Sequence, residues 1–145
     1  MKTLITLLTA LVLSTSAMAD KPFKVLGDNK VYYSAFNSSF IDPKIASENN
    51  IVRGADRGLI NIAVVPNDKE SGGITALVKG TVTNIIQQSQ KLDFFEVREG
   101  DVVYYLASFK FDHEDSLTFK IEVKADPNKP SETLTFRKTF YEDGK

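Results

Sequence analysis

The sequence predicts an all-β protein: a single antiparallel β-sandwich of about seven strands with one short helix. The first observation is a period of two, which is clearest in residues 117–124, where apolar and polar side chains alternate without a fault. The second is the short, regular spacing of such runs, which turn-forming residues separate. Together these patterns favour an immunoglobulin-like sandwich, and a small β-barrel is the alternative.

Seven runs carry the strand pattern. Residues 59–65 are apolar at nearly every position, which indicates a central strand covered on both faces. Residues 102–111 start with apolar groups at both parities and end with two phenylalanines on one face. The predicted strands are residues 30–36, 59–65, 74–83, 91–97, 102–111, 117–124 and 133–140.

The segments between these runs have the residues of turns and of one helix. Glu99-Gly100-Asp101 predicts a tight hairpin, and residues 126–130 form a loop punctuated by two prolines. Asp42 can cap a helix and Pro43 suits its first position, so we expect a short helix over residues 43–49. No linker or internal repeat interrupts the pattern, which indicates one domain.

The composition excludes several kinds of chemistry. The 145 residues include 18 basic and 19 acidic side chains, one histidine, and no cysteine or tryptophan. Without cysteine there are no disulfides, thiolate metal sites or thiol nucleophiles. The charge balance lacks the basic excess of a nucleic-acid-binding protein, so we expect no nucleic-acid partner. One histidine is too few for a zinc site, and we expect no metal and no cofactor.

Residues 1–19 have the features of a secretory signal peptide. A basic start at Lys2 precedes the apolar run 3–13, and Ala17-Met18-Ala19 matches the small-x-small pattern of a cleavage site. The apolar run is shorter than the roughly 20 residues that a membrane-spanning helix needs, so we expect no membrane anchor. The predicted mature protein, residues 20–145, is a single soluble domain in a bacterial periplasm.

Three pairs of adjacent aromatic residues lie in predicted strands: Tyr32-Tyr33, Phe94-Phe95 and Tyr104-Tyr105. Neighbours along a strand point to opposite faces, so one member of each pair should leave the core side. We expect Tyr33, Phe95 and Tyr105 to form an exposed apolar patch that binds a ligand or a partner. The alternative is that these strands are covered on both faces.

Four polar residues are further candidates for ligand or partner binding. Arg57 and Asn61 are four residues apart in one predicted strand and should lie on the same face. Asn61 is the polar residue of an otherwise apolar run. It could anchor a ligand in a groove, or it could bond to neighbouring backbone. Asn37 directly follows an aromatic run, and Arg98 stands at a charged hairpin tip. His113, in an acidic turn, could act in general acid–base catalysis, although no partner nucleophile stands out.

Several stretches together resemble a known family. They are residues 32–40, 57–62 and 97–101, with the later Tyr104-Tyr105-Leu106 and Thr139-Phe140-Tyr141. With the signal peptide, the whole mature chain resembles the DUF4426 family, small exported proteins of Gram-negative proteobacteria. The resemblance implies a periplasmic location and one domain, and it implies no activity and no catalytic residues.

Three functions remain open at this point. The first is a non-enzymatic periplasmic binding or accessory module that holds a protein partner or a small apolar ligand on an aromatic sheet face or along an edge strand, for which residues 132–141 are a candidate. The second is a small hydrolase or isomerase that uses His113 or the carboxylates of residues 112–115. The third is a structural envelope protein. The absence of nucleophile motifs favours the first, with no catalytic residue assigned.

Overall fold

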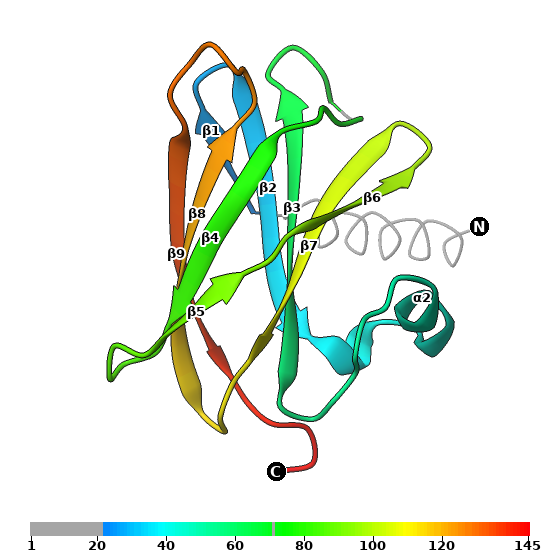
Figure 1. The fold of residues 1–145 in the computed structure, drawn as a ribbon, viewed down its shortest axis with the longest axis vertical. Helices are drawn as coiled ribbons and strands as arrows, with labels where there is room; N and C mark the ends of the chain where they lie inside the picture. The colour runs from blue at the N-terminus through cyan, green and yellow to red at the C-terminus, as the bar shows by residue number, and fades with distance from the viewer. Residues whose placement is uncertain (1–21, 71) are drawn as a thin grey trace, which may run out of the picture.

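The structure, a computed structural model, describes residues 22–70 and 72–145. Two antiparallel sheets pack face to face (Figure 1), with strand orders β1-β2-β3-β7-β6 and β5-β4-β8-β9. The elements are β1 (Phe23–Leu26), β2 (Asn29–Asn37), η1 (Ser38–Phe40), α2 (Pro43–Glu48), β3 (Arg57–Pro66), β4 (Leu77–Thr83), β5 (Ser89–Leu92), β6 (Phe95–Glu99), β7 (Val102–Lys110), β8 (Asp115–Lys124) and β9 (Glu132–Phe140). The predicted sandwich is confirmed, and the predicted signal peptide lies outside the described residues.

The described part of the chain has nine strands where the sequence predicts seven. The predicted strand 91–97 divides: β5 pairs with β4 in one sheet, and β6 pairs with β7 in the other. Strands that change sheets in this way form the corners of sandwiches. The other additional strand is β1, which has only four residues and pairs with β2.

The core lies between the two sheets, and the period of two places its residues. Alternate side chains of β7 and β8 point inward, and Phe119 is fully buried. Its ring stacks on Phe136 at 4.8 Å and meets Phe109 edge-on at 5.1 Å between centroids. Phe140 packs edge-on against Phe109, also at 5.1 Å. Such tilted and edge-on contacts stabilise aromatic clusters beyond the area that they bury.

Phe109 depends on a glycine in the neighbouring strand. Gly58 on β3 lies directly opposite Phe109 on β7. A Cβ atom at Gly58 would come within 2.3 Å of the Phe109 ring, so only glycine leaves room for it. The ring therefore covers the glycine backbone and fills the end of the core.

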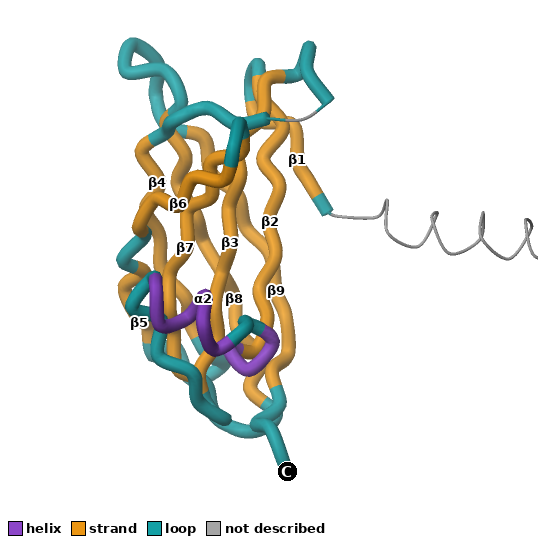
Figure 2. Tube along the Cα trace, turned by 90° about the vertical axis from the view of Figure 1, so that its right-hand side faces the viewer, coloured by secondary structure: helices purple, strands orange, loops and turns teal. Residues whose placement is uncertain are grey.

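The short helix and the turn before it cover one half of the outer face of the five-stranded sheet. Asp42 caps α2 by accepting a hydrogen bond from the Lys44 backbone at 2.8 Å, and Pro43 opens the helix, as the sequence predicts. Ala46 and Ile51 pack with Leu59 of β3 in a second small core. Figure 2 shows α2 lying against the lower half of this sheet. No helix of residues 22–70 and 72–145 covers the upper half of the same face.

Side chains close the seam where β4 and β6, from different sheets, run past each other. The Tyr105 hydroxyl accepts a hydrogen bond from the Ala76 backbone at 2.9 Å and donates one to Glu96 at 3.0 Å. Arg98 donates to the second oxygen of Glu96 at 2.9 Å. Burial raises the pKa of Tyr105, whereas the hydrogen bonds from Arg98 and Tyr105 hold the pKa of Glu96 below its usual value.

Lysine and asparagine side chains close the opposite seam, between β9 and the β1–β2 edge. Lys24 donates to the Thr135 carbonyl at 3.0 Å, and Lys138 donates to the Ala35 carbonyl. Asn37 donates to the Tyr141 carbonyl at 2.9 Å. Burial lowers the pKa of Lys138, which points inward from the edge strand β9. An inward lysine on an edge strand discourages pairing with another chain.

We predict that Gly58→Ala destabilises the protein by about 1–3 kcal/mol, because the new methyl group forces the Phe109 ring out of its place. Urea unfolding followed by circular dichroism measures the change. Gly54→Ala is the matched control, since its Cβ would meet only the ends of flexible side chains, Arg57 at 3.2 Å and Asp56 at 3.4 Å. An equal loss of unfolding free energy in the two variants would contradict the role of the Phe109 contact.

We predict that Tyr105→Phe lowers the free energy of unfolding at pH 7 by about 1–3 kcal/mol, because the Ala76 N–H loses its acceptor. The raised pKa of Tyr105 gives a second expectation. The neutral Tyr105 side chain contributes fully to the free energy of unfolding below the unfolded-state pKa of about 10. This contribution is lost as the pH rises through the folded-state pKa. The difference in the free energy of unfolding between the wild type and the variant should therefore decrease at alkaline pH.

The control for this prediction is Tyr141→Phe, because Tyr141 is more than half exposed and no hydrogen bond of its hydroxyl occurs among the described residues. It should change the unfolding free energy by less than about 0.5 kcal/mol, as is usual for surface substitutions. A Tyr105→Phe protein as stable as this control at pH 7 would show that the seam does not depend on the hydroxyl.

Candidate functional site

The uncovered half of the outer face carries a groove of about 270 Å³. Strands β2, β3 and β7 form it, and the register places Tyr32 beside Ala63 and Ser34 beside Asn61. Tyr104 of β7 lines the groove from the other side of β3. The residues that line the groove from the strands include Tyr32, Ser34, Asn61, Ala63, Val65 and Tyr104, and Glu70 and Gly72 line it from the loop after β3.

Each aromatic pair places its two members on opposite faces of the sheet. In the pairs Tyr32-Tyr33 and Tyr104-Tyr105, the member expected on the outer face lies on the core side. Tyr33 points into the core, where its ring lies 4.6 Å from Phe136, and Tyr105 is only 6% exposed. The expectation that Tyr33 and Tyr105 form an outer patch is therefore wrong. Their partners Tyr32 and Tyr104 line the outer groove instead.

The residues two positions away on each side explain why Tyr33 and Tyr105 face the core. Tyr33 shares its parity with the buried Val31 and Ala35, whereas Tyr32 shares its parity with Lys30 and Ser34. Likewise, Tyr105 alternates with the buried Val103 and Ala107. The sequence signal was the small and apolar neighbours two residues away on each side.

Phe95 is on the outer face, as predicted, but it does not belong to the groove. It packs against the small core beneath α2, together with Leu106 and Ile51. The helix segment thus covers the half of the face on which Phe95 lies, and the exposed part of the aromatic face is the half with Tyr32 and Tyr104.

Asn61 occupies the polar position of the groove. Its side chain is half-buried in the middle of β3, flanked by Ile60 and Ile62, which point to the core. The Asn61 Oδ1 atom is buried and accepts no hydrogen bond from any described residue. A buried, unpaired amide oxygen costs about 1–3 kcal/mol, so such an atom is rarely left without a role.

The other three polar candidates lie away from the groove. Arg57 begins β3 at the end that α2 covers, four residues from Asn61. Asn37 holds the C-terminal segment, because its amide also donates to Asp143 at 3.0 Å. Hydrogen bonds from Ser39 and Asn37 lower the pKa of Asp143. Arg98 pairs with Glu96 at the β4–β6 seam.

His113 also contacts the C-terminal segment. Its Nδ1 atom accepts a hydrogen bond from the Glu142 backbone at 3.2 Å, and its ring meets Tyr141 edge-on at 5.9 Å. Its Nε2 atom lies 3.8 Å from the Glu114 carboxylate. These contacts give His113 a structural task in the β7–β8 turn. Among residues 22–70 and 72–145, no group of three or more histidine, aspartate or glutamate side chains could hold a metal ion.

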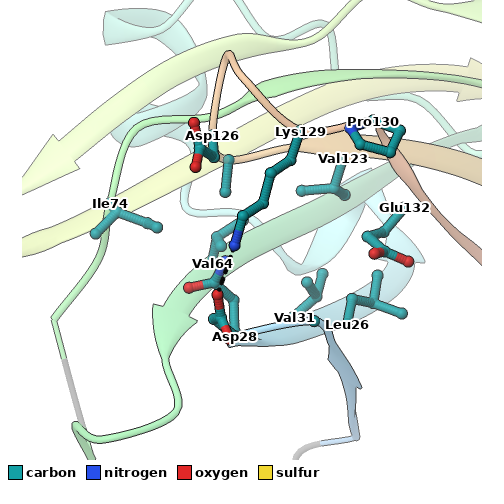
Figure 3. A pocket seen from close by; sticks show the side chains of 13 residues that line it. Leu26, Asp28, Val31, Val64, Ile74, Val123, Asp126, Lys129, Pro130 and Glu132 are labelled. Atoms are coloured by element: carbon teal, nitrogen blue, oxygen red, sulfur yellow. Dashed lines mark hydrogen bonds and ion pairs between the residues drawn. The ribbon is translucent and has the colours of Figure 1, made fainter.

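A second hollow lies at the end of the sandwich, between the β1–β2 turn and the loop of residues 126–130 (Figure 3). Its volume is about 410 Å³, and valines from both sheets form its floor. Lys129 reaches across it to Asp28, with 3.0 Å between the ammonium and the carboxylate. The hydrogen bond to Asp28 raises the pKa of Lys129.

Solved structures with this fold include three that are informative. The chain is 32% identical to a DUF4426 family protein from Pseudomonas aeruginosa PAO1, with a TM-score of 0.74 over 84% of this chain and 95% of that one. A copper-bound variant of FetP from uropathogenic Escherichia coli strain F11 is 9% identical, with a TM-score of 0.57 over 83% of this chain and 95% of that one.

FetP from the same strain in its as-isolated form, expressed recombinantly in the Escherichia coli periplasm, is 8% identical, with a TM-score of 0.54 over 83% of this chain and 93% of that one. At such identities the likeness to FetP extends to the fold alone. Among curated protein sequences, none matches this chain.

No helix among the described residues is long and apolar enough to cross a membrane. The family model of a domain of unknown function, DUF4426, matches residues 23–143, which include every described strand from β1 to β9. The resemblance that the sequence suggested is thereby confirmed, and the chain belongs to the DUF4426 family.

Proposed function

We propose that this protein is an exported, non-enzymatic binding module of the periplasm and that its ligand site is the outer-face groove. The observation that carries the proposal is the buried Oδ1 atom of Asn61, which has no donor among the described residues. It lies on the sheet face that Tyr32 and Tyr104 flank. A ligand that donates a hydrogen bond to this amide would recover the cost of leaving it unpaired.

The shape and chemistry of the groove define the class of ligand. Tyr32 and Tyr104 offer ring faces, and Ala63 and Val65 offer a small apolar floor. A volume of about 270 Å³ suits a single ring rather than a large molecule. The Asn61 side chain lines the groove beside these rings, so its amide is the polar group nearest to such a ligand. We therefore expect a small aromatic or apolar molecule that carries one hydroxyl or amide donor.

A protein partner on the same face is the second candidate. Phe23 and Val25 on the edge strand β1 are 46% and 58% exposed. The Phe23 ring lies 5.1 Å from that of Tyr32, so it continues the aromatic surface beyond the groove. The signal pattern of residues 1–19 supports export.

We predict that the exported protein begins at Asp20. A C-terminally tagged chain produced in a Gram-negative host should appear in the osmotic-shock fraction, and intact-mass spectrometry should give the mass of residues 20–145 plus tag. Replacing Leu7 and Leu8 with arginine interrupts the apolar run and should retain the full-length chain in the cytoplasm. An uncleaved chain in the periplasm, or a cleaved one in the cytoplasm, would contradict this signal assignment.

We predict that the mature protein binds p-cresol more tightly than 4-methylanisole by about fivefold to tenfold, because only the phenol donates a hydrogen bond to Asn61. Two-dimensional NMR titration of ¹⁵N-labelled protein measures both affinities and locates the shifted amides. Asn61→Ala should remove the preference for p-cresol. Tyr104→Ala should weaken the binding of both compounds, since it removes one wall of the groove.

Phe40→Ala is the matched control, because Phe40 is 77% exposed and lies in η1, outside the groove. It should leave both affinities unchanged. Equal affinities for the two compounds in the wild-type protein, or shifts that avoid residues 32–34, 61–65 and 102–104, would refute the groove as the ligand site. Shifts confined to Phe23 and Val25 would direct attention to the protein-partner alternative.

A further inference from the structure

We propose that the hollow at the end of the sandwich is a second binding site, specific for small amphipathic amines: molecules with a short alkyl chain and one ammonium group. This site is independent of the outer-face groove. It lies between the sheets, whereas the groove lies on the outer surface of one of them.

The interior of the hollow is apolar. Val31 and Val64 come from the five-stranded sheet, and Val123 comes from the four-stranded sheet. The half-buried Leu26 and Ile74 form opposite walls, as Figure 3 shows. A volume of about 410 Å³ accommodates a chain of several methylene groups, whose transfer from water to an apolar site is favourable.

The rim is acidic. Asp28, Asp126 and Glu132 line it with three carboxylates, and Lys129 is the single basic side chain among the lining residues. Lys129 pairs with Asp28, and no ion pair of Glu132 occurs among the described residues. The rim therefore has an excess of two negative charges, which attracts a cation and repels an anion.

Lys129 shows which chemistry this hollow accepts. Its side chain is an alkyl chain ending in an ammonium group, and it extends across the hollow to the Asp28 carboxylate. Both side chains of the pair are largely exposed, at 62% and 83%, and such exposed pairs contribute little to stability. A free alkylammonium ion can therefore displace Lys129, with its chain between the half-buried Leu26 and Ile74 and its charge at the rim.

The test uses n-hexylammonium, 1-hexanol and hexanoate as probes of one chain length, again with NMR titration of the mature protein. Hexylammonium should shift amides around Val31, Val64 and Val123 in a saturable manner. Hexanol should bind about threefold to fivefold more weakly at low salt, and hexanoate more weakly still. The preference for the amine should decrease as the ionic strength rises.

Three variants test which side chains give the hollow its preference for amines. Lys129→Ala empties the mouth and frees Asp28, so it should tighten hexylammonium binding. Glu132→Gln combined with Asp126→Asn should lower the affinity for hexylammonium to that for hexanol. Glu99→Gln, at the exposed β6–β7 hairpin, is the matched charge control and should change nothing.

The failure of this proposal is distinguishable from failure of the outer-face groove. Asn61→Ala should bind hexylammonium as the wild type does, because Asn61 does not line the hollow. Hexanol binding as tightly as hexylammonium, tighter binding of hexanoate, weaker binding by Lys129→Ala, or shifts confined to the outer face would each overturn the proposal.

Discussion

The burial of Tyr105 is the constraint that sets which side chains of β7 face the core, and its hydroxyl joins the two sheets at one seam. Ladder hydrogen bonds hold strands together within each sheet, but none joins one sheet to the other at the seams. At the β4–β6 seam this phenol accepts from the Ala76 backbone and donates to Glu96, so it satisfies a backbone N–H where no strand can do so. Its burial also decides the parity of β7, which places Tyr104 on the outer face.

The opposite seam limits where a partner can bind. Lys24, Lys138 and Asn37 already donate to backbone carbonyls along the gap between β9 and the β1–β2 edge. Strand addition to β9 would have to displace these bonds and place a new strand beside the inward Lys138. The half of the outer face that α2 leaves open carries the groove, so we favour binding on this half over the edge-strand mode that the sequence also permits.

Local patterns in the sequence were sufficient for the fold class, the helix and the strands with strict alternation, because these depend on neighbours within a few residues. The same patterns contained the parity of Tyr33 and Tyr105, in the small residues two positions away. The division of residues 91–97 between sheets and the seam contacts had no such signal. Lys138 and Ala35 are 103 residues apart, and a lysine that will bond to a distant carbonyl resembles any surface lysine in the sequence.

The two proposed sites share the strands β2 and β3 and use opposite faces of them. Val31 and Val64 face the hollow at the end of the sandwich, whereas Tyr32 and Ala63, their direct neighbours, face the groove. Because the period of a strand is two, a one-residue shift of β2 against β3 would turn Val31 outward and Tyr32 inward, which would remove a wall from both sites together. The register of this single strand pair therefore positions both proposed sites, and the packed core behind it keeps that register.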